Sequence, residues 1–528
     1  MSSDEAFFAS NPLQNAGGRS PASRLLQHND GSCDPAFASC EPVPFDAVAE
    51  RPEFPSASTN PCKLCTPLGA CLAFRGIAGA VPLLHGSQGC STYIRRYLIS
   101  HFREPVDIAS TNFSEDTAVF GGRKNLHVAL DNIGRQYRPA LIGIATTCLS
   151  ETMGENMPML IGEYGAEARD LPAAVDRPAL VYVSTPSFKG THADGFHAAV
   201  RALVETLAEA GRKSEVGGQK SEGEGRRSEI EDRKTEIPPR RVALMPNMVS
   251  PADLRHLRDL CSEWGTGVTL VPDYSETLDG PSWADFERTP AGGTTVAELR
   301  ALGGAPAAIE LGHVLARTEH TAGTHLKSKF HVSLHRIGLP IGVRACDEFS
   351  AAMEAATGRE MPRRIALERG RLVDSYVDAH KYLAGKKAVV YGEEDLVAGL
   401  AVFLAETGVT PVLCASGGRT KHLADAIFGA APELRGRAEV REGSDFGDIE
   451  ARAAELKPDL LIGSSKGYKL ARSLGIPLVR CGFPVHDRLG AQRIRLLGYA
   501  GTQELFDRIV NAVLETKQED SEIGYAYL

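Results

Sequence analysis

Residues 60–77 read NPCKLCTPLGACLAFRGI, and residues 81–90 read VPLLHGSQGC. The rest of the chain is organised around this stretch. Cys62 and Cys65 stand directly before a Pro-Leu-Gly sequence that predicts a turn, and Cys90 ends a Gly-Ser-Gln-Gly loop. A Cys-x-x-Cys pair alone is a weak signal, because zinc half-sites, redox pairs and chance all produce it.

A further cysteine, Cys148, follows the apolar run LIGIATTC, which predicts a buried strand. Ligands of parallel α/β sheets gather at the C-terminal strand ends, where Cys148 falls. Thiolates on such loops bind soft metals, so the cysteines predict an iron–sulfur site. Cys65, Cys90 and Cys148 supply three thiolates, one fewer than a simple cubane cluster uses. A partner chain is the simplest source of the remaining ligands. The alternative for each cysteine taken alone is a buried thiol that only packs.

Alternating apolar strands and helical stretches predict an α/β fold with three Rossmann-like domains built on parallel sheets. The predicted segments are an N-terminal extended arm (1–60), α/β domain I with the thiols (61–211), a charged low-complexity insertion (212–240), α/β domain II (241–385), and α/β domain III with a C-terminal helix (386–528).

The individual elements follow from apolar runs and helix signals. Strands are predicted at 140–146, 179–184, 241–246, 268–272, 307–311, 387–392, 410–414, 458–463 and 476–480, and helices at 194–211, 251–265, 368–386 and 502–516. Gly463-Ser-Ser-Lys-Gly467 is too short for a nucleotide phosphate loop and predicts a strand-to-helix turn. We therefore expect nucleotide hydrolysis to belong to a separate partner.

Composition sets further bounds on the 528-residue chain. It is 43% apolar and 24% charged, with a mean hydropathy of -0.16. No apolar run reaches the roughly 18 residues of a membrane span, and the N-terminus lacks the apolar core of a secretory signal, so we expect a cytoplasmic protein. A net charge of -9 argues against nucleic-acid binding. Four of the eleven cysteines lie in or beside apolar segments and are predicted to be core thiols: Cys261, Cys346, Cys414 and Cys481.

Several motifs together resemble the β-type subunits of the nitrogenase component 1 family: NPCKLCTPLGA, HGSQGC, HFREP, AVFGG, TTCLSE, TPSFKGTH, ERGRLVD and GFPVHDR. The resemblance runs in order from about residue 60 to the C-terminus and implies three Rossmann-like domains. In the catalytic β subunit, three cysteines and a serine hold half of the bridging [8Fe-7S] P-cluster. Those positions match Cys65, Cys90, Cys148 and Ser187, and Cys62 falls outside the set as a packing thiol or a neighbour of the ligands.

Two members of the family compete for the detailed resemblance. One group of NifN chains, half of the NifEN scaffold for the iron–molybdenum cofactor, is closer in CKLCTPLGA, STYIRRYLISHFREPVDIAS, SETLDGP, LLIGSSKGYKLARSLGIPLVR and EIGYAYL. The best-known NifN chains keep only the Gly-x-x-Gly-Cys ligand, to a [4Fe-4S] cluster, whereas this sequence keeps all the P-cluster-type cysteines. We favour the scaffold. The alternative is a catalytic β subunit, NifK-like or from a related reductase for nitrogen or methylthio-alkanes.

The resemblance also implies partners. They are a homologous α-type subunit (NifE-like or NifD-like) in an α2β2 heterotetramer and a NifH-type ATP-dependent iron protein. The iron–molybdenum cofactor or its precursor would be held mainly by the α-type partner. An alternative of another class is a metal-free α/β small-molecule binding module whose cysteines only pack.

Overall fold

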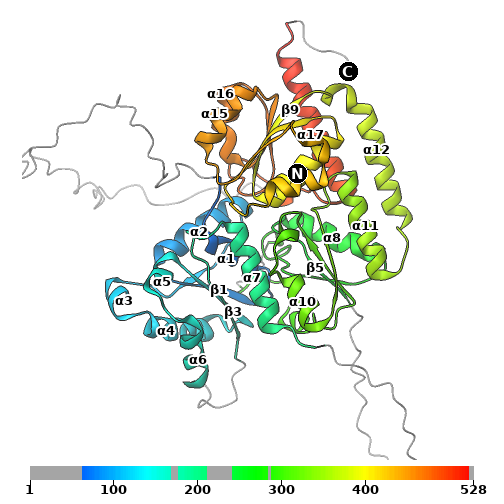
Figure 1. Ribbon diagram of the computed structural model, residues 1–528. Coiled ribbons are helices and arrows are strands. Elements are labelled where there is room, and N and C mark those ends of the chain that lie inside the picture. The colour runs from blue at the N-terminus through cyan, green and yellow to red at the C-terminus, as the bar shows by residue number, and fades with distance from the viewer. Residues whose placement is uncertain (1–61, 168–176, 211–240, 283–286, 523–528) are drawn as a thin grey trace, which may run out of the picture. The chain divides into compact units, whose positions relative to one another are not determined.

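The computed structural model describes residues 62–167, 177–210, 241–282 and 287–522. The predicted arm (1–60) and the predicted insertion (212–240) lie outside the described residues. The described residues form three α/β regions (Figure 1).

The first sheet has four parallel strands in the order β2-β1-β3-β4. Its central strands β1 and β3 are buried along their whole length, because helices cover both faces of a parallel sheet. The elements are β1 (Ala80–His85), β2 (Ala109–Ser110), β3 (Leu141–Thr146) and β4 (Ala179–Val183), with α1 (Thr66–Arg75), α2 (Gln88–Phe102), α3 (Glu115–Phe120), α4 (Arg123–Tyr137), α5 (Cys148–Met153), α6 (Met157–Glu167) and α7 (His192–Leu207).

The second sheet has four parallel strands in the order β6-β5-β7-β8, and the third has five in the order β11-β10-β9-β12-β13. The second region comprises β5 (Val242–Met245), α8 (Pro251–Glu263), β6 (Val268–Leu270), α9 (Val296–Arg300), β7 (Ala307–Leu311), η4 (Leu315–Arg317), α10 (Ala322–Phe330), β8 (Ser333–Ile337), α11 (Val343–Thr357) and α12 (Arg363–Leu383). The third comprises β9 (Lys387–Gly392), α13 (Glu394–Glu406), β10 (Thr410–Ser416), α14 (Leu423–Ala430), η5 (Pro432–Leu434), β11 (Glu439–Arg441), α15 (Phe446–Leu456), β12 (Leu460–Gly463), η6 (Ser465–Gly467), α16 (Tyr468–Leu474), β13 (Leu478–Arg480), η7 (Ala491–Arg493) and α17 (Gly498–Glu519).

The predicted fold class, α/β with several parallel sheets, is confirmed. The predicted domain boundaries stay predictions. Four strands were not predicted from the sequence: the buried central strand β1 and the partly buried edge strands β2, β8 and β11. The helix predicted to run to residue 211 ends at Leu207, because Ala208 turns extended and the Glu209 N–H donates to the Arg300 carbonyl.

The turn predicted at Pro-Leu-Gly is wrong. Cys65 is the N-cap residue of α1, Thr66 is its first residue and Pro67 its second. Proline is tolerated there because the first backbone N–H groups of a helix have no intrahelical partner.

Helix α1 lies side by side with α7 at a very close crossing (Figure 1). Two glycines make this possible. A Cβ on Gly69 of α1 would lie 1.7 Å from the His192 carbonyl oxygen, and a Cβ on Gly195 of α7 would lie 1.8 Å from the Thr66 carbonyl oxygen. The backbones of α1 and α7 are thus in direct contact, which fixes where α1 begins.

None of the described helices combines the length and the apolar character that crossing a bilayer requires.

Candidate functional site

Three of the four predicted ligands follow the ends of three neighbouring strands. In the first sheet His85 of β1 pairs with Thr146 of β3, and Ala145 of β3 pairs with Val183 of β4, so these strands end at one edge. The loop after β1 leads to Cys90, the loop after β3 to Cys148, and the loop after β4 to Ser187. Parallel topology therefore brings residues almost a hundred positions apart to a common edge.

Cys148 and Ser187 are in direct contact. The Ser187 backbone N–H donates to Cys148 Sγ at 3.3 Å, and the Cys148 side chain is exposed. Below them, the hydroxyl groups of Thr146 and Ser184 both donate to the Glu151 carboxylate, which ties the β3 and β4 loops together. Sequence reasoning quoted Glu151 within TTCLSE without giving it this role.

Cys90 lies in the first turn of α2 and is half-buried. The Ser87 hydroxyl donates to its Sγ at 3.7 Å. The loop before it needs glycine for packing, because a Cβ on Gly86 would lie 2.1 Å from Thr147 Oγ1. A Cβ on Gly89 would have open space instead, with only Ser87 Oγ nearby, at 3.9 Å. The face of the loop at Gly89 is thus open.

Cys65 comes from a different element and reaches the same region through the β4–α7 loop. The Thr66 hydroxyl donates to the Pro186 carbonyl at 3.4 Å, and the Leu64 N–H donates to His192 Nδ1 at 3.3 Å. The Cys65 side chain is exposed. All three thiols therefore stand at the beginning of a helix, where the backbone N–H groups and the helix dipole favour negative charge.

Cys62 differs from these three thiols. It is 7% exposed and packs in the core beside the third sheet, against Tyr391 and Leu413 among others. Burial raises the pKa of its thiol to about 12, so the group stays protonated at neutral pH. The predicted core thiols Cys261, Cys346, Cys414 and Cys481 are also buried, as expected.

Large exposed apolar side chains stand within three residues of the predicted ligands in the sequence. Tyr93 on α2 is 57% exposed, Leu149 on α5 is 41% exposed, and Phe188 beside Ser187 is 63% exposed. Exposed apolar groups gathered on neighbouring elements are typical of a surface that another chain covers. Within the described ranges no three His, Cys, Asp or Glu side chains converge as one metal ion would require. The predicted thiols Cys65, Cys90 and Cys148 are therefore not gathered in the described part of the chain as a site for one ion.

A second feature, which sequence reasoning missed, is a cavity of about 390 Å³. Its lining comes from β4 and α7, from the segment after β7, and from the start of α13, including Asp194, Arg201, Glu393 and Glu394. Burial, reinforced by the neighbouring Asp395 charge, raises the pKa of Glu393 to about 8. Burial also raises the pKa of Glu394 to about 7.

The carboxylates around this cavity are committed to internal contacts. Glu393 caps α13 by accepting from the Leu396 N–H at 2.7 Å. Asp395 accepts from the Val314 N–H at 2.6 Å and from Asn247 Nδ2 at 2.9 Å, which joins the second and third sheets. We read these groups as structural.

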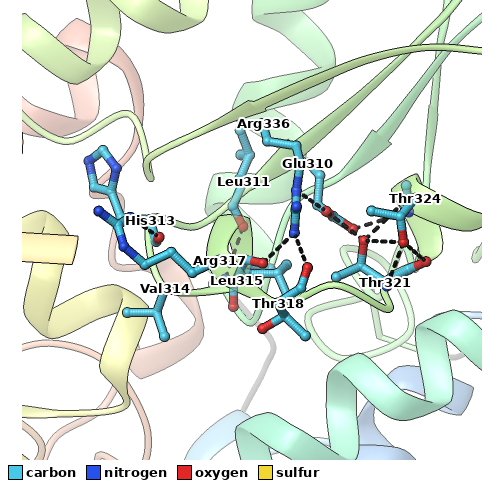
Figure 2. A network of polar contacts seen from close by, with 12 residues as sticks. Glu310, Leu311, His313, Val314, Leu315, Arg317, Thr318, Thr321, Thr324 and Arg336 are labelled. Carbon is cyan, nitrogen blue, oxygen red and sulfur yellow. Dashed lines mark hydrogen bonds and ion pairs between the residues drawn. The ribbon is translucent and has the colours of Figure 1, made fainter. Parts of the chain in front are cut away.

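Beside the cavity lies the network of Figure 2. Glu310 on β7 is 2% exposed and accepts from Arg336 Nε at 3.1 Å and from the Thr321 hydroxyl at 2.8 Å. Arg336 also donates to the carbonyls of Leu315 and Thr318 (Figure 2). This ion pair, buried at Glu310 and partly exposed at Arg336, holds the segment after β7 in place together with its further hydrogen bonds. No sequence signal pointed to it, because the partners are far apart in the chain and of common types.

Comparison with known proteins decides the family. The sequence profile described as nitrogenase component 1 type oxidoreductase matches residues 65–514. The chain belongs to the nitrogenase component 1 family. The matched range takes in the whole of the site described above.

Relatives in the nitrogenase component 1 family include the nitrogenase molybdenum-iron protein beta chain of Methanococcus maripaludis, 34% identical over 88% of this chain and 96% of the relative. The beta chain of Clostridium pasteurianum is 34% identical over the same shares, and that of Azotobacter vinelandii is 33% identical over 88% of this chain and 86% of its own. Among solved structures, nitrogenase Cp1 at pH 6.5 matches with a TM-score of 0.80 and 32% identity, over 91% of this chain and 98% of that one. The chain is thus a β-type member of the family.

Proposed function

We propose that this chain is the electron-relay half of a two-subunit complex and holds one side of an iron–sulfur cluster at the subunit interface. Its ligands are Cys65, Cys90, Cys148 and Ser187. The observation that carries the proposal is that Cys90, Cys148 and Ser187 follow three neighbouring strand ends, with both thiols exposed or half-buried and the Ser187 N–H on Cys148 Sγ.

The bound cluster would accept and release electrons, and the chain's own residues prepare its surroundings. Cys65 is the N-cap residue of α1, and Cys90 and Cys148 lie in the first turns of α2 and α5, so the positive dipole ends of these helices would stabilise the negative charge of a bound cluster. The contact of Gly86 with Thr147 keeps the two ligand loops together, and Glu151 fixes the β4 loop that carries Ser187. The exposed apolar side chains beside the thiols would exclude water once a partner covers them.

The proposed partner is a homologous α-type subunit, NifE-like or NifD-like, in an α2β2 heterotetramer in the cytoplasm, where thiols stay reduced. That partner would complete the cluster, either [8Fe-7S] or [4Fe-4S], and would hold most of the iron–molybdenum cofactor or its precursor. A NifH-type iron protein would supply electrons and carry out the ATP hydrolysis.

The first experiment measures iron and acid-labile sulfide in the complex, purified without oxygen together with its α-type partner. Cys90→Ala and Cys148→Ala should each lose iron, because each removes a thiolate ligand. The matched control is Cys62→Ala, which removes a buried thiol outside the ligand set and should keep the iron content of the parent. Full iron content in both ligand variants would show that the ligands are misplaced.

Within this role we favour a scaffold of the NifEN type, on which the iron–molybdenum cofactor precursor matures. Its support is the set of NifN-like motifs, among them STYIRRYLISHFREPVDIAS and LLIGSSKGYKLARSLGIPLVR. The second candidate is the catalytic β subunit, and its support is that the similar curated chains are named as molybdenum-iron protein beta chains. Turnover separates the two: with reductase, ATP and an electron donor, a scaffold transfers cofactor to an acceptor apo-protein, whereas a catalytic complex reduces substrate without such transfer.

The alternative of another class is a metal-free binding module, for which the cavity of about 390 Å³ would be the binding site. A colourless, iron-free complex with a stoichiometric small molecule would favour it over the cluster.

A further inference from the structure

The segment that carries Cys65 is held by the third sheet as well as by the first. The Cys62 N–H donates to the Ser444 carbonyl at 3.2 Å, and the Gly417 N–H donates to the Cys62 carbonyl at 3.2 Å. A Cβ on Gly417 would lie 2.5 Å from that carbonyl oxygen, so the approach is close. The C-terminal region of the chain therefore determines where the segment before α1 lies.

A further contact brings a positive charge to this segment. Lys466 lies in η6, directly after β12, within the Gly463–Gly467 turn, and its Nζ donates to the Lys63 carbonyl at 3.5 Å. Burial lowers the pKa of the Lys466 ammonium, and its electrostatic interaction with Cys62 and Cys65 opposes that shift. The Lys63 carbonyl that the ammonium contacts lies two residues before Cys65, whose side chain is exposed.

We propose that Lys466 is a positioning residue for the cluster site, which fixes the Cys65 segment from the third sheet and raises the reduction potential of the cluster by its charge. The inference rests on the proposed function. Reduction adds negative charge to the cluster, and a partly buried cation stabilises that charge more than a solvated one does. Neighbouring charge and hydrogen bonds around the ligands are established means of setting cluster potentials.

Three substitutions separate the charge from the hydrogen bond. Lys466→Arg keeps both, Lys466→Gln keeps a donor without the charge, and Lys466→Met removes both. The matched control is Lys469→Met, an exposed lysine three residues further on. The measurement is a redox titration of the cluster by EPR in the oxygen-free complex, with iron content and thermal midpoint as checks on assembly and folding.

We expect Lys466→Gln and Lys466→Met to lower the reduction potential of the cluster by about 59 mV. For a one-electron couple this is about a tenfold rise in the ratio of oxidised to reduced cluster at a fixed potential. Lys466→Arg and Lys469→Met should keep the parent value. An unchanged potential in a folded, iron-loaded Lys466→Gln complex would overturn the inference and leave the proposed function intact. A shift in Lys466→Met alone would also overturn it, because the hydrogen bond and not the charge would then be responsible. An iron-free parent complex would refute both.

Discussion

The crossing of α1 and α7 offers a sharp test, because the substitution Gly69→Ala places a methyl group against backbone. The new Cβ would lie 1.7 Å from the His192 carbonyl oxygen and 2.7 Å from the Phe196 nitrogen. Ordinary C···O contacts in proteins are about 3.3 Å, so α1 must move by about 1.6 Å. Overpacking of this kind costs about 1–3 kcal/mol, and backbone atoms cannot rotate away, which puts the cost at the upper end. Alanine recovers up to about 1 kcal/mol of helix propensity.

We therefore expect Gly69→Ala to lower the free energy of unfolding by about 2 kcal/mol. The matched control is Gly370→Ala on α12, where nothing lies within 4 Å of the new Cβ, and it should be stabilising by up to about 1 kcal/mol. Urea unfolding of both variants gives the difference as a shift in midpoint at an unchanged slope. Equal midpoints for the two variants would refute the close crossing. Since Cys65 is the N-cap residue of α1, Gly69→Ala should also lower the iron content of the complex.

Two further predictions concern the second and third sheets. Arg336→Met leaves Glu310 buried without its cation and should lower the free energy of unfolding, measured in urea, by about 3–5 kcal/mol. The control Arg364→Met, whose side chain is 63% exposed, should lower it by at most about 1 kcal/mol. Similar losses in the two variants would contradict the role of burial at Glu310. Burial raises the pKa of Glu393 from 4.5 to about 8, so in this pH range the folded state keeps a proton that the unfolded state releases. Stability from this group therefore falls as pH rises, by up to about 1.4 kcal/mol per pH unit, and Glu393→Gln should flatten the dependence in unfolding measured from pH 5 to 8. The same pH dependence of the free energy of unfolding in the parent and in Glu393→Gln would show that Glu393 does not cause it.

Much of the fold could be read from local patterns. Buried parallel strands are continuous apolar runs, and 307–311 and 387–392 coincide with β7 and β9. The edge strands β2 and β11 were missed because a two- or three-residue strand has no such run, and β8 because it is only partly buried. The central strand β1 was missed although it is buried, and its run is interrupted by Pro82, a residue that argues against a central strand. Pro-Leu-Gly was misread as a turn because glycine is a weak helix former. Its place in α1 is explained by the backbone of α7, which no local pattern reports.

The sequence by itself determined the fold class, the family resemblance and the chemical character of the site, since residue types and motif order are properties of the chain alone. Only the tertiary structure decided which of the cysteines are accessible. Cys62 and Cys65 are three residues apart, yet one is buried beside the third sheet and the other is exposed at the start of α1. The physical reason is that burial and charge depend on neighbours brought from distant parts of the chain, such as Gly417 and Lys466, and spacing along the sequence carries no record of them.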